Sequence, residues 1–164
     1  QGNHDYWWES LKKMRALPLT TIDFIQNDAI LLPEGAVPSV AGPVAVCGTR
    51  GWMTPGDRIW GEDQAHNEKV YQREAARLKL SLEAGRKLGA VASIAMLHYP
   101  PVAEDHQPTL FTELLESFGG VLACVYGHLH GAGAQLRAYQ GIHGGVAYRL
   151  VACDSIDFTP VRLF

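Results

Sequence analysis

Two apolar runs decide how this chain folds, AVASIAML at residues 90–97 and VLACVY at residues 121–126. A pattern typical of a short helix lies between them, at residues 109–118. A strand–helix–strand unit of this kind makes its two strands parallel, so their carboxyl ends lie at the same edge of the sheet. Near-continuous apolar runs are also typical of strands that are buried on both faces. We therefore predict an α/β protein.

Histidines follow both of these runs directly. His98 comes after the first run, and His128 and His130 come after the second within the glycine-bounded segment GHLHG. Residues at positions i and i+2 of an extended chain point to the same side, so His128 and His130 are expected to face one target. Parallel pairing brings His98 close to them at the edge where α/β proteins bind ligands. The sequence therefore predicts a metal site here.

The remaining elements are predicted from periodicity and from turn residues. Helices are expected at residues 6–17 and 63–88, the second being the longest and ending at Gly89. Short strands are expected at residues 21–25, 29–32, 44–47, 147–153 and 160–164. The first three of these are expected to be antiparallel neighbours. The glycine-rich segment after residue 131 predicts no element.

Composition limits the class of protein. The 164 residues suffice for one domain, and 47% apolar with 19% charged residues is typical of a globular chain. A net charge of -3 disfavours a general nucleic-acid binder, and no apolar run is long enough to predict a membrane span. Cys47, Cys124 and Cys153 lie in apolar stretches without CxxC spacing. We expect them to be core residues of a cytoplasmic protein rather than metal ligands.

Three motifs together resemble the calcineurin-like metallophosphoesterase family. They are GNHD at residues 2–5, His98 after a strand, and GHLH at residues 127–130, which match the last three of that family's five sequence blocks. The segments NHDYWW (3–8), GTRGW (48–52) and HYPP (98–101) are also similar to a bacterial subgroup of predicted phosphohydrolases. The resemblance implies an αββα sandwich, in which two packed mixed sheets are flanked by helices. It also implies a binuclear site for Mn²⁺, Fe or Zn²⁺.

The resemblance assigns roles to individual residues of this chain. It implies that one metal ion is bound by Asn3, His98 and His128. The other ion would be bound by His130. His4 would face the phosphate of the substrate and either stabilise the transition state or protonate the leaving oxygen. Asp5 would orient His4.

Two interpretations of the loop between residues 48 and 61 remain open: a surface connection held in place by its tryptophans, or a binding site for the anionic group of a small phosphoester substrate. Arg50 and Arg58 lie in this loop, and a planar guanidinium suits phosphate, although loop arginines are usually only solvated. Tyr99, directly after His98, is a further candidate for the wall of the site.

The sequence departs from the family in its carboxylates. The first two blocks, a D-x-H and a G-D block, are not found ahead of the GNHD motif within these 164 residues, and no D-x-H occurs anywhere in them. We therefore expect the C-terminal portion of a larger domain, with its N-terminal strands missing and an exposed sheet edge that favours self-association. Such a chain should hold at most one metal ion, weakly, and have little or no activity.

Two other functions remain open at this point. A non-catalytic scaffold or interaction module would keep the fold and lose the site, but the histidines of the motifs are all present. A mononuclear structural zinc site would fit the missing carboxylates, although such sites are usually rich in cysteine.

Overall fold

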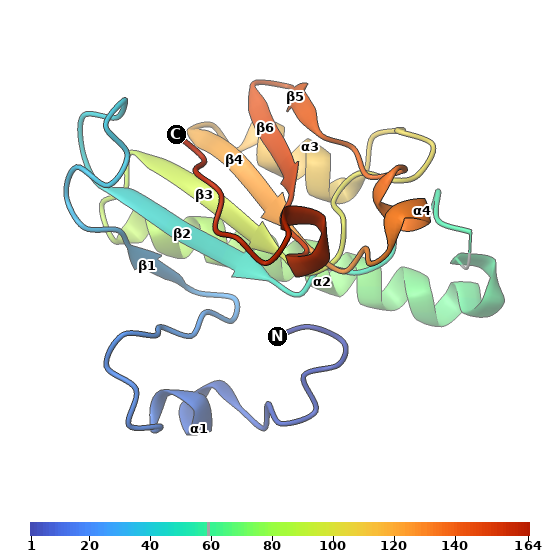
Figure 1. The fold of residues 1–164 in the computed structure, drawn as a ribbon, viewed down its shortest axis with the longest axis horizontal. Coiled ribbons are helices and arrows are strands. Elements are labelled where there is room, and N and C mark those ends of the chain that lie inside the picture. Colours follow the sequence, from blue (N-terminus) through green and yellow to red (C-terminus); the bar gives the residue numbers. More distant parts are fainter. Residues whose placement is uncertain (59) are drawn as a thin grey trace.

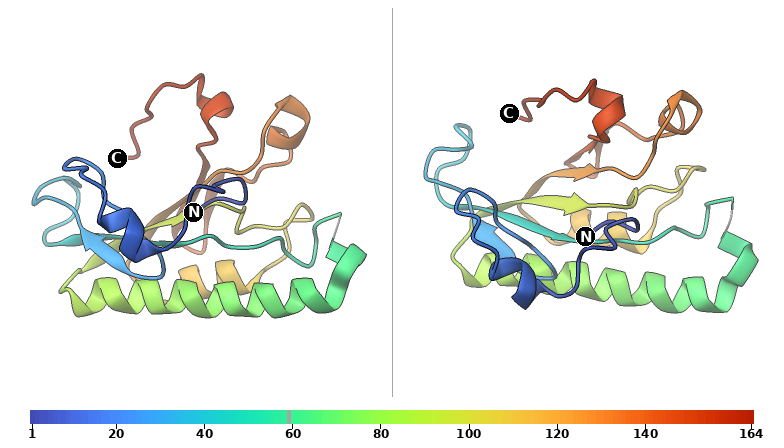
Figure 2. Two further views of the ribbon diagram at one scale, coloured as in Figure 1. Left: turned by 90° about the horizontal axis from the view of Figure 1, so that it is seen from below. Right: turned by 60° about the horizontal axis from the view of Figure 1, so that its bottom comes forward.

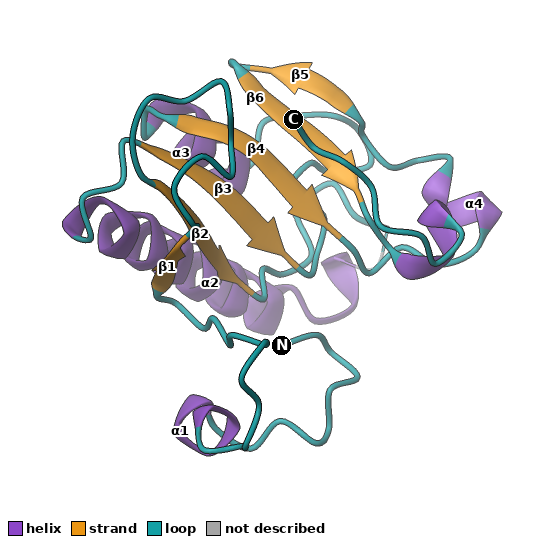
Figure 3. Ribbon diagram, turned by 60° about the vertical axis from the view of Figure 1, so that its left-hand side comes forward, coloured by secondary structure: helices purple, strands orange, loops and turns teal. Residues whose placement is uncertain are grey.

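A mixed β-sheet forms the centre of the structure, a computed structural model that describes residues 1–58 and 60–164. Its six strands lie in the order β1-β2-β3-β4-β6-β5 (Figure 1). Their bounds are β1 Ala29–Leu31, β2 Val44–Thr49, β3 Ala92–Leu97, β4 Val121–Tyr126, β5 Gly141–His143 and β6 Val146–Leu150. Strands β2, β3, β4 and β6 are parallel, and β1 and β5 are antiparallel edges (Figure 3). The predicted α/β class is confirmed.

Helices cover one face of this sheet. The α-helices are α1 Leu11–Arg15, α2 Gln64–Lys87, α3 Leu110–Ser117 and α4 Ala132–Gln135, and short 3-10 helices η1 and η2 span Trp60–Asp63 and Cys153–Ile156. Figure 2 shows α2 and α3 on one side of the sheet and the C-terminal segment on the other. Within the described ranges, no helix combines the length and the apolar character that crossing a membrane requires.

The long helix α2 starts and packs as the sequence predicts. The Asp63 carboxylate accepts a hydrogen bond from the backbone N–H of His66 at 3.3 Å, which satisfies one of the free donors at the helix start. Leu78 and Leu82 are fully buried in the main core, together with Cys47 of β2 and Ala95 of β3. Apolar burial of this kind fixes the helix against the centre of the sheet.

The predicted strand–helix–strand unit is also confirmed. β3 and β4 are parallel neighbours, with Leu97 opposite Tyr126, and α3 connects them. Thr109 and Thr112 form reciprocal hydrogen bonds that start α3. Because β2, β3, β4 and β6 are parallel, their last residues share one edge of the sheet, and the chain segments that leave this edge build the candidate site.

Three predicted elements differ from the structure. The N-terminal helix covers only Leu11–Arg15 rather than residues 6–17, and residues 21–25 and 160–164 do not form strands. Residues 21–23 are exposed, and residues 21–25 do not pair with β1, which is the outermost strand of the sheet. Pro160 carries no N–H for a ladder, and the last three residues are exposed. The elements α4 and β5 formed without a predictive pattern in a glycine-rich segment.

Candidate metal centre

Donor atoms from three distant segments meet at the carboxyl edge of the sheet. His98 follows β3, His128 follows β4, and Asn3 belongs to the N-terminal segment. His98 Nε2 lies 2.6 Å from Asn3 Oδ1 and 3.1 Å from His128 Nδ1. Ligand atoms around one divalent ion with bonds of about 2.1 Å are roughly 3 Å apart. The distances from His98 Nε2 to the amide oxygen and to the second imidazole nitrogen are therefore compatible with a shared metal ion of this size.

The turn that presents His128 is conformationally strained. His128 has a φ of 70°, in the left-handed region that non-glycine residues rarely adopt. Its ring packs against the buried ring of Tyr99, with centroids 4.1 Å apart. Left-handed non-glycine residues cost about 1–3 kcal/mol and occur disproportionately at functional sites. The structure thus holds this imidazole in place at an energetic cost.

Both imidazoles of this centre favour the neutral form. Burial, with a smaller contribution from the neighbouring His128, lowers the pKa of His98 to about 4. Burial also lowers the pKa of His128, with smaller contributions from His130 and His4. A neutral imidazole keeps the nitrogen lone pair that a metal ion needs, so both rings favour the protonation state that binds metal at neutral pH.

The N-terminal turn places His4 beside these ligands. Asn3 Nδ2 lies 3.4 Å from His4 Nε2, so the Asn3 side chain contacts His98 with one end and His4 with the other. The Asp5 carboxylate accepts a 2.6 Å hydrogen bond from the backbone N–H of Gly2, and the expected contact with the His4 ring is not among the hydrogen bonds of the described residues. Gly2 itself allows close approach, because a Cβ there would lie 2.9 Å from His98 Cε1.

His130 points to a different set of partners. Its Nδ1 lies 2.8 Å from Asp154 Oδ1, and the second oxygen of this carboxylate accepts a 2.8 Å hydrogen bond from the Gly131 N–H. The Gly131 N–H and the His130 ring together lower the pKa of Asp154. Cys153 lies in the same cluster and is exposed, so the prediction that it belongs to the core is wrong. Cys47 and Cys124 are buried as predicted.

Sequence reasoning missed Asp154 as a site residue. The signal was present in the topology, because β6 is a parallel neighbour of β4 with Leu150 opposite Tyr126. The backbone N–H of Val151 continues this pairing through a 2.7 Å hydrogen bond to the Tyr126 carbonyl. Residues that follow β6 therefore lie beside residues that follow β4, as His98 lies beside His128.

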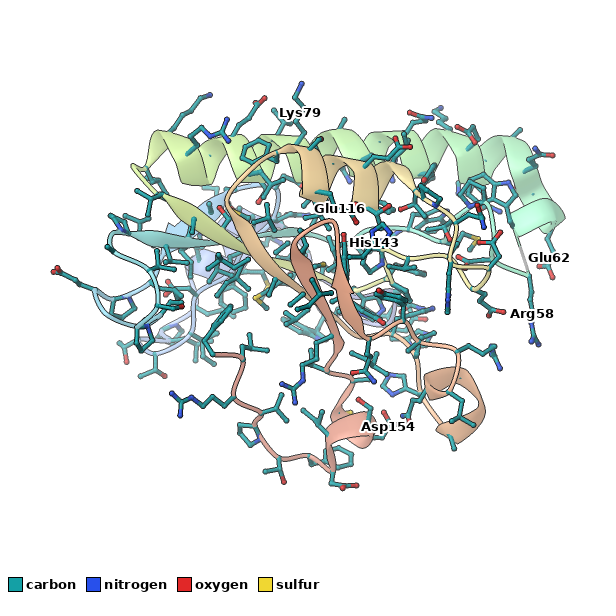
Figure 4. The ribbon with its side chains drawn as sticks, turned by 90° about the horizontal axis from the view of Figure 1, so that it is seen from above. Arg58, Glu62, Lys79, Glu116, His143 and Asp154 are labelled. Carbon is teal, nitrogen blue, oxygen red and sulfur yellow. The ribbon has the colours of Figure 1, made fainter. Side chains whose placement is uncertain are left out.

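The candidate substrate residues separate into two groups. Arg50 lies 4.6 Å above the Trp52 ring and lines a small polar cavity of about 80 Å³ with Arg73 and Arg77. Its carbonyl accepts hydrogen bonds from the N–H groups of His98 and Tyr99, both at 3.0 Å. Arg58 instead forms an exposed ion pair with Glu104 at 3.0 Å. Figure 4 shows Arg58 at the periphery, far from Asp154. Arg50 and Tyr99 thus adjoin the centre, and Arg58 does not.

A cleft opens beside the metal centre. It has a volume of about 520 Å³ and is lined by His98 together with Trp8, Phe24 and Met96, among others. Its size is in the range of small-molecule binding sites. A ligand seated in it would therefore contact His98 and residues of β2 and β3.

The low pKa of His98 predicts acid sensitivity of the metal-free fold. An unfolded histidine takes up a proton near pH 6.5, whereas folded His98 resists protonation down to about pH 4. The stability should therefore be complete above pH 6.5 and fall as the pH decreases toward 4, by on the order of 1 kcal/mol after allowance for solvent screening. Urea unfolding in chelator at pH 7.5 and 5.0 measures this change. The decline should be shallower in His98→Asn, and an equal decline in both proteins would contradict the assignment.

Comparisons of the chain with models of known protein families, with curated proteins and with solved structures find no match. Any functional assignment consequently rests on the residues and their geometry.

Proposed function

We propose that this protein is a metal-dependent phosphoester hydrolase of the metallophosphoesterase type. The convergence of Asn3 Oδ1, His98 Nε2 and His128 Nδ1 carries the proposal. These residues come from three motifs that also resemble the blocks of that family. In the corresponding αββα fold, the sheet described here would form one of the two packed layers.

The donor atoms suit the proposed chemistry. Nitrogen and oxygen ligands without thiolate at this point favour Mn²⁺, Fe or Zn²⁺. When bound, divalent ions neutralise phosphate charge and acidify a water molecule so that it can attack phosphorus. Asn3, His98 and His128 would hold one ion, and His130 would contribute to a second.

The other residues would position the substrate and move the proton. His4 is exposed and lies next to Asn3, where its imidazole can protonate the leaving oxygen. The guanidinium of Arg50 offers donors to the phosphate oxygens. The Tyr99 ring packs against the His128 ring and supports it. The Asp5 carboxylate fixes the N-terminal turn by accepting a hydrogen bond from the Gly2 N–H. The cleft beside His98 would accommodate the organic part of a small phosphoester.

Hydrolysis of bis-p-nitrophenyl phosphate tests the proposal. We expect slow turnover that requires added Mn²⁺ and stops in chelator. Turnover should be slow because the 164 residues lack the D-x-H and G-D blocks, which in the proposed family supply further ligands and the carboxylate that bridges both ions. His4→Ala should lower the rate roughly 100-fold while leaving metal affinity unchanged, since His4 is assigned to proton transfer. Equal rates for His4→Ala and the unmodified chain, or no turnover at any metal concentration, would overturn the proposal.

A further inference from the structure

Three kinds of metal-binding atom meet in a second cluster at the same sheet edge. An imidazole nitrogen of His130, the thiol of Cys153 and a carboxylate oxygen of Asp154 all lie within 4.8 Å of one another. His130 follows β4, whereas Cys153 and Asp154 belong to η2 after β6. The topology of parallel neighbours therefore assembles this cluster, as it does the one around His98.

The cluster is held in place before any ligand binds. Asp154 uses one oxygen for His130 and the other for the backbone N–H of Gly131, both at 2.8 Å. This arrangement fixes the carboxylate and the turn that carries the imidazole. In η2, the hydroxyl of Ser155 donates to the Ala152 carbonyl at 2.7 Å, which orders the backbone next to Cys153.

The exposure of Cys153 distinguishes this cluster from an ordinary surface ion pair. Free cysteines are among the most buried residues, and Cys47 and Cys124 of this chain are both 0% exposed. Cys153 is exposed beside an imidazole and a carboxylate instead. A simple His–Asp pair would not need a thiol within reach of both partners.

We propose that His130, Cys153 and Asp154 bind a thiophilic divalent cation of the Zn²⁺ class. A thiolate combined with an imidazole and a carboxylate selects Zn²⁺ or Co²⁺ over Mg²⁺, Ca²⁺ and Mn²⁺. Binding releases the thiol proton, and a neutral imidazole coordinates through the ring nitrogen that carries no hydrogen. Three protein ligands leave one coordination position of a tetrahedral ion open for water. This inference deepens the proposed function, because His130 is one of its metal ligands.

Titration of the metal-free protein with Co²⁺ tests this site, because a thiolate ligand gives Co²⁺ an intense near-ultraviolet charge-transfer band. We expect the band to saturate at one equivalent per chain. Cys153→Ser should lose it, and Asp154→Asn should bind Co²⁺ about 10-fold more weakly. Cys124→Ala removes a buried thiol as a control and should keep the band. A wild-type protein without the band, or a Cys153→Ser protein that retains it, would overturn the inference.

The same samples separate this inference from the proposed hydrolase. The ligands Asn3, His98 and His128 contain no sulfur and cannot give the band. Hydrolysis in the absence of a band would refute the Cys153 site and leave the hydrolase standing. A band lost in Cys153→Ser, without hydrolysis under any metal, would support the site and refute the hydrolase.

Discussion

Replacement of His98 by alanine is expected to reduce both metal affinity and metal-dependent hydrolysis by roughly 100-fold or more. His98 Nε2 is the shared neighbour of Asn3 Oδ1 and His128 Nδ1, so its removal leaves the other two donors without the atom between them. Isothermal titration with Mn²⁺ measures the affinity, and bis-p-nitrophenyl phosphate reports the rate.

His66→Ala provides the matched control for this loss. His66 is an exposed histidine on α2, and alanine is a better helix former, so both the fold and the metal affinity should be preserved. The unfolding temperature of both variants should be measured in chelator. A folded His98→Ala protein with unchanged Mn²⁺ affinity would show that these three side chains form only a polar packing contact.

The central part of the fold could be predicted from sequence because its signals are local and strong. The runs at residues 90–97 and 121–126 became β3 and β4, and the long helix predicted at residues 63–88 became α2, with Asp63 as its N-cap. Residues 21–25 alternate equally well but form no strand, because a strand also needs a neighbour to pair with. Sequence patterns report the preference of one segment and not the presence of its partner.

The candidate site shows the same limit. The parallel arrangement of β3 and β4 was enough to predict that His98 and His128 lie together, which their 3.1 Å separation confirms. The prediction that His128 and His130 face one target assumed an extended chain. The left-handed conformation of His128 interrupts that extension, and His130 contacts Asp154 instead. His128 and His130 therefore have different partners although a single residue separates them.

Asn3 illustrates a contact that neither spacing nor topology could predict. It lies 95 positions before His98, in a segment without a strand to fix its place. Its position in the candidate metal centre was predicted only from the resemblance to the GNHD block. The Asn3 side chain also contacts the His4 ring, a contact that was expected from Asp5. Short polar turns carry too little periodic information for such assignments.

The second large effect concerns Gly48, which sets the spacing between two strands that support the site. Gly48 pairs with Met96 across β2 and β3, and its N–H donates to Ser81 Oγ at 2.7 Å. A Cβ at this position would lie 2.3 Å from the Met96 carbonyl oxygen, far inside contact distance. Gly48→Ala must therefore separate the strands or displace α2, and we expect it to destabilise the fold by about 3 kcal/mol. The unfolding temperature in chelator should decrease by roughly 2–4 °C for each kcal/mol.

The same substitution should weaken metal binding, because the strain arises two residues before Arg50. The Arg50 carbonyl accepts hydrogen bonds from the N–H groups of His98 and Tyr99, so a shift of β2 moves the proposed ligand His98 and the Tyr99 ring that packs against His128. Gly133→Ala is the control, since a Cβ there meets no atom within 4 Å and α4 should gain about 0.5–1 kcal/mol from the better helix former. Equal unfolding temperatures for the two variants would mean that β2 and β3 can separate without cost. Loss of stability in Gly48→Ala with full Mn²⁺ affinity would instead show that Arg50 does not couple β2 to the metal centre.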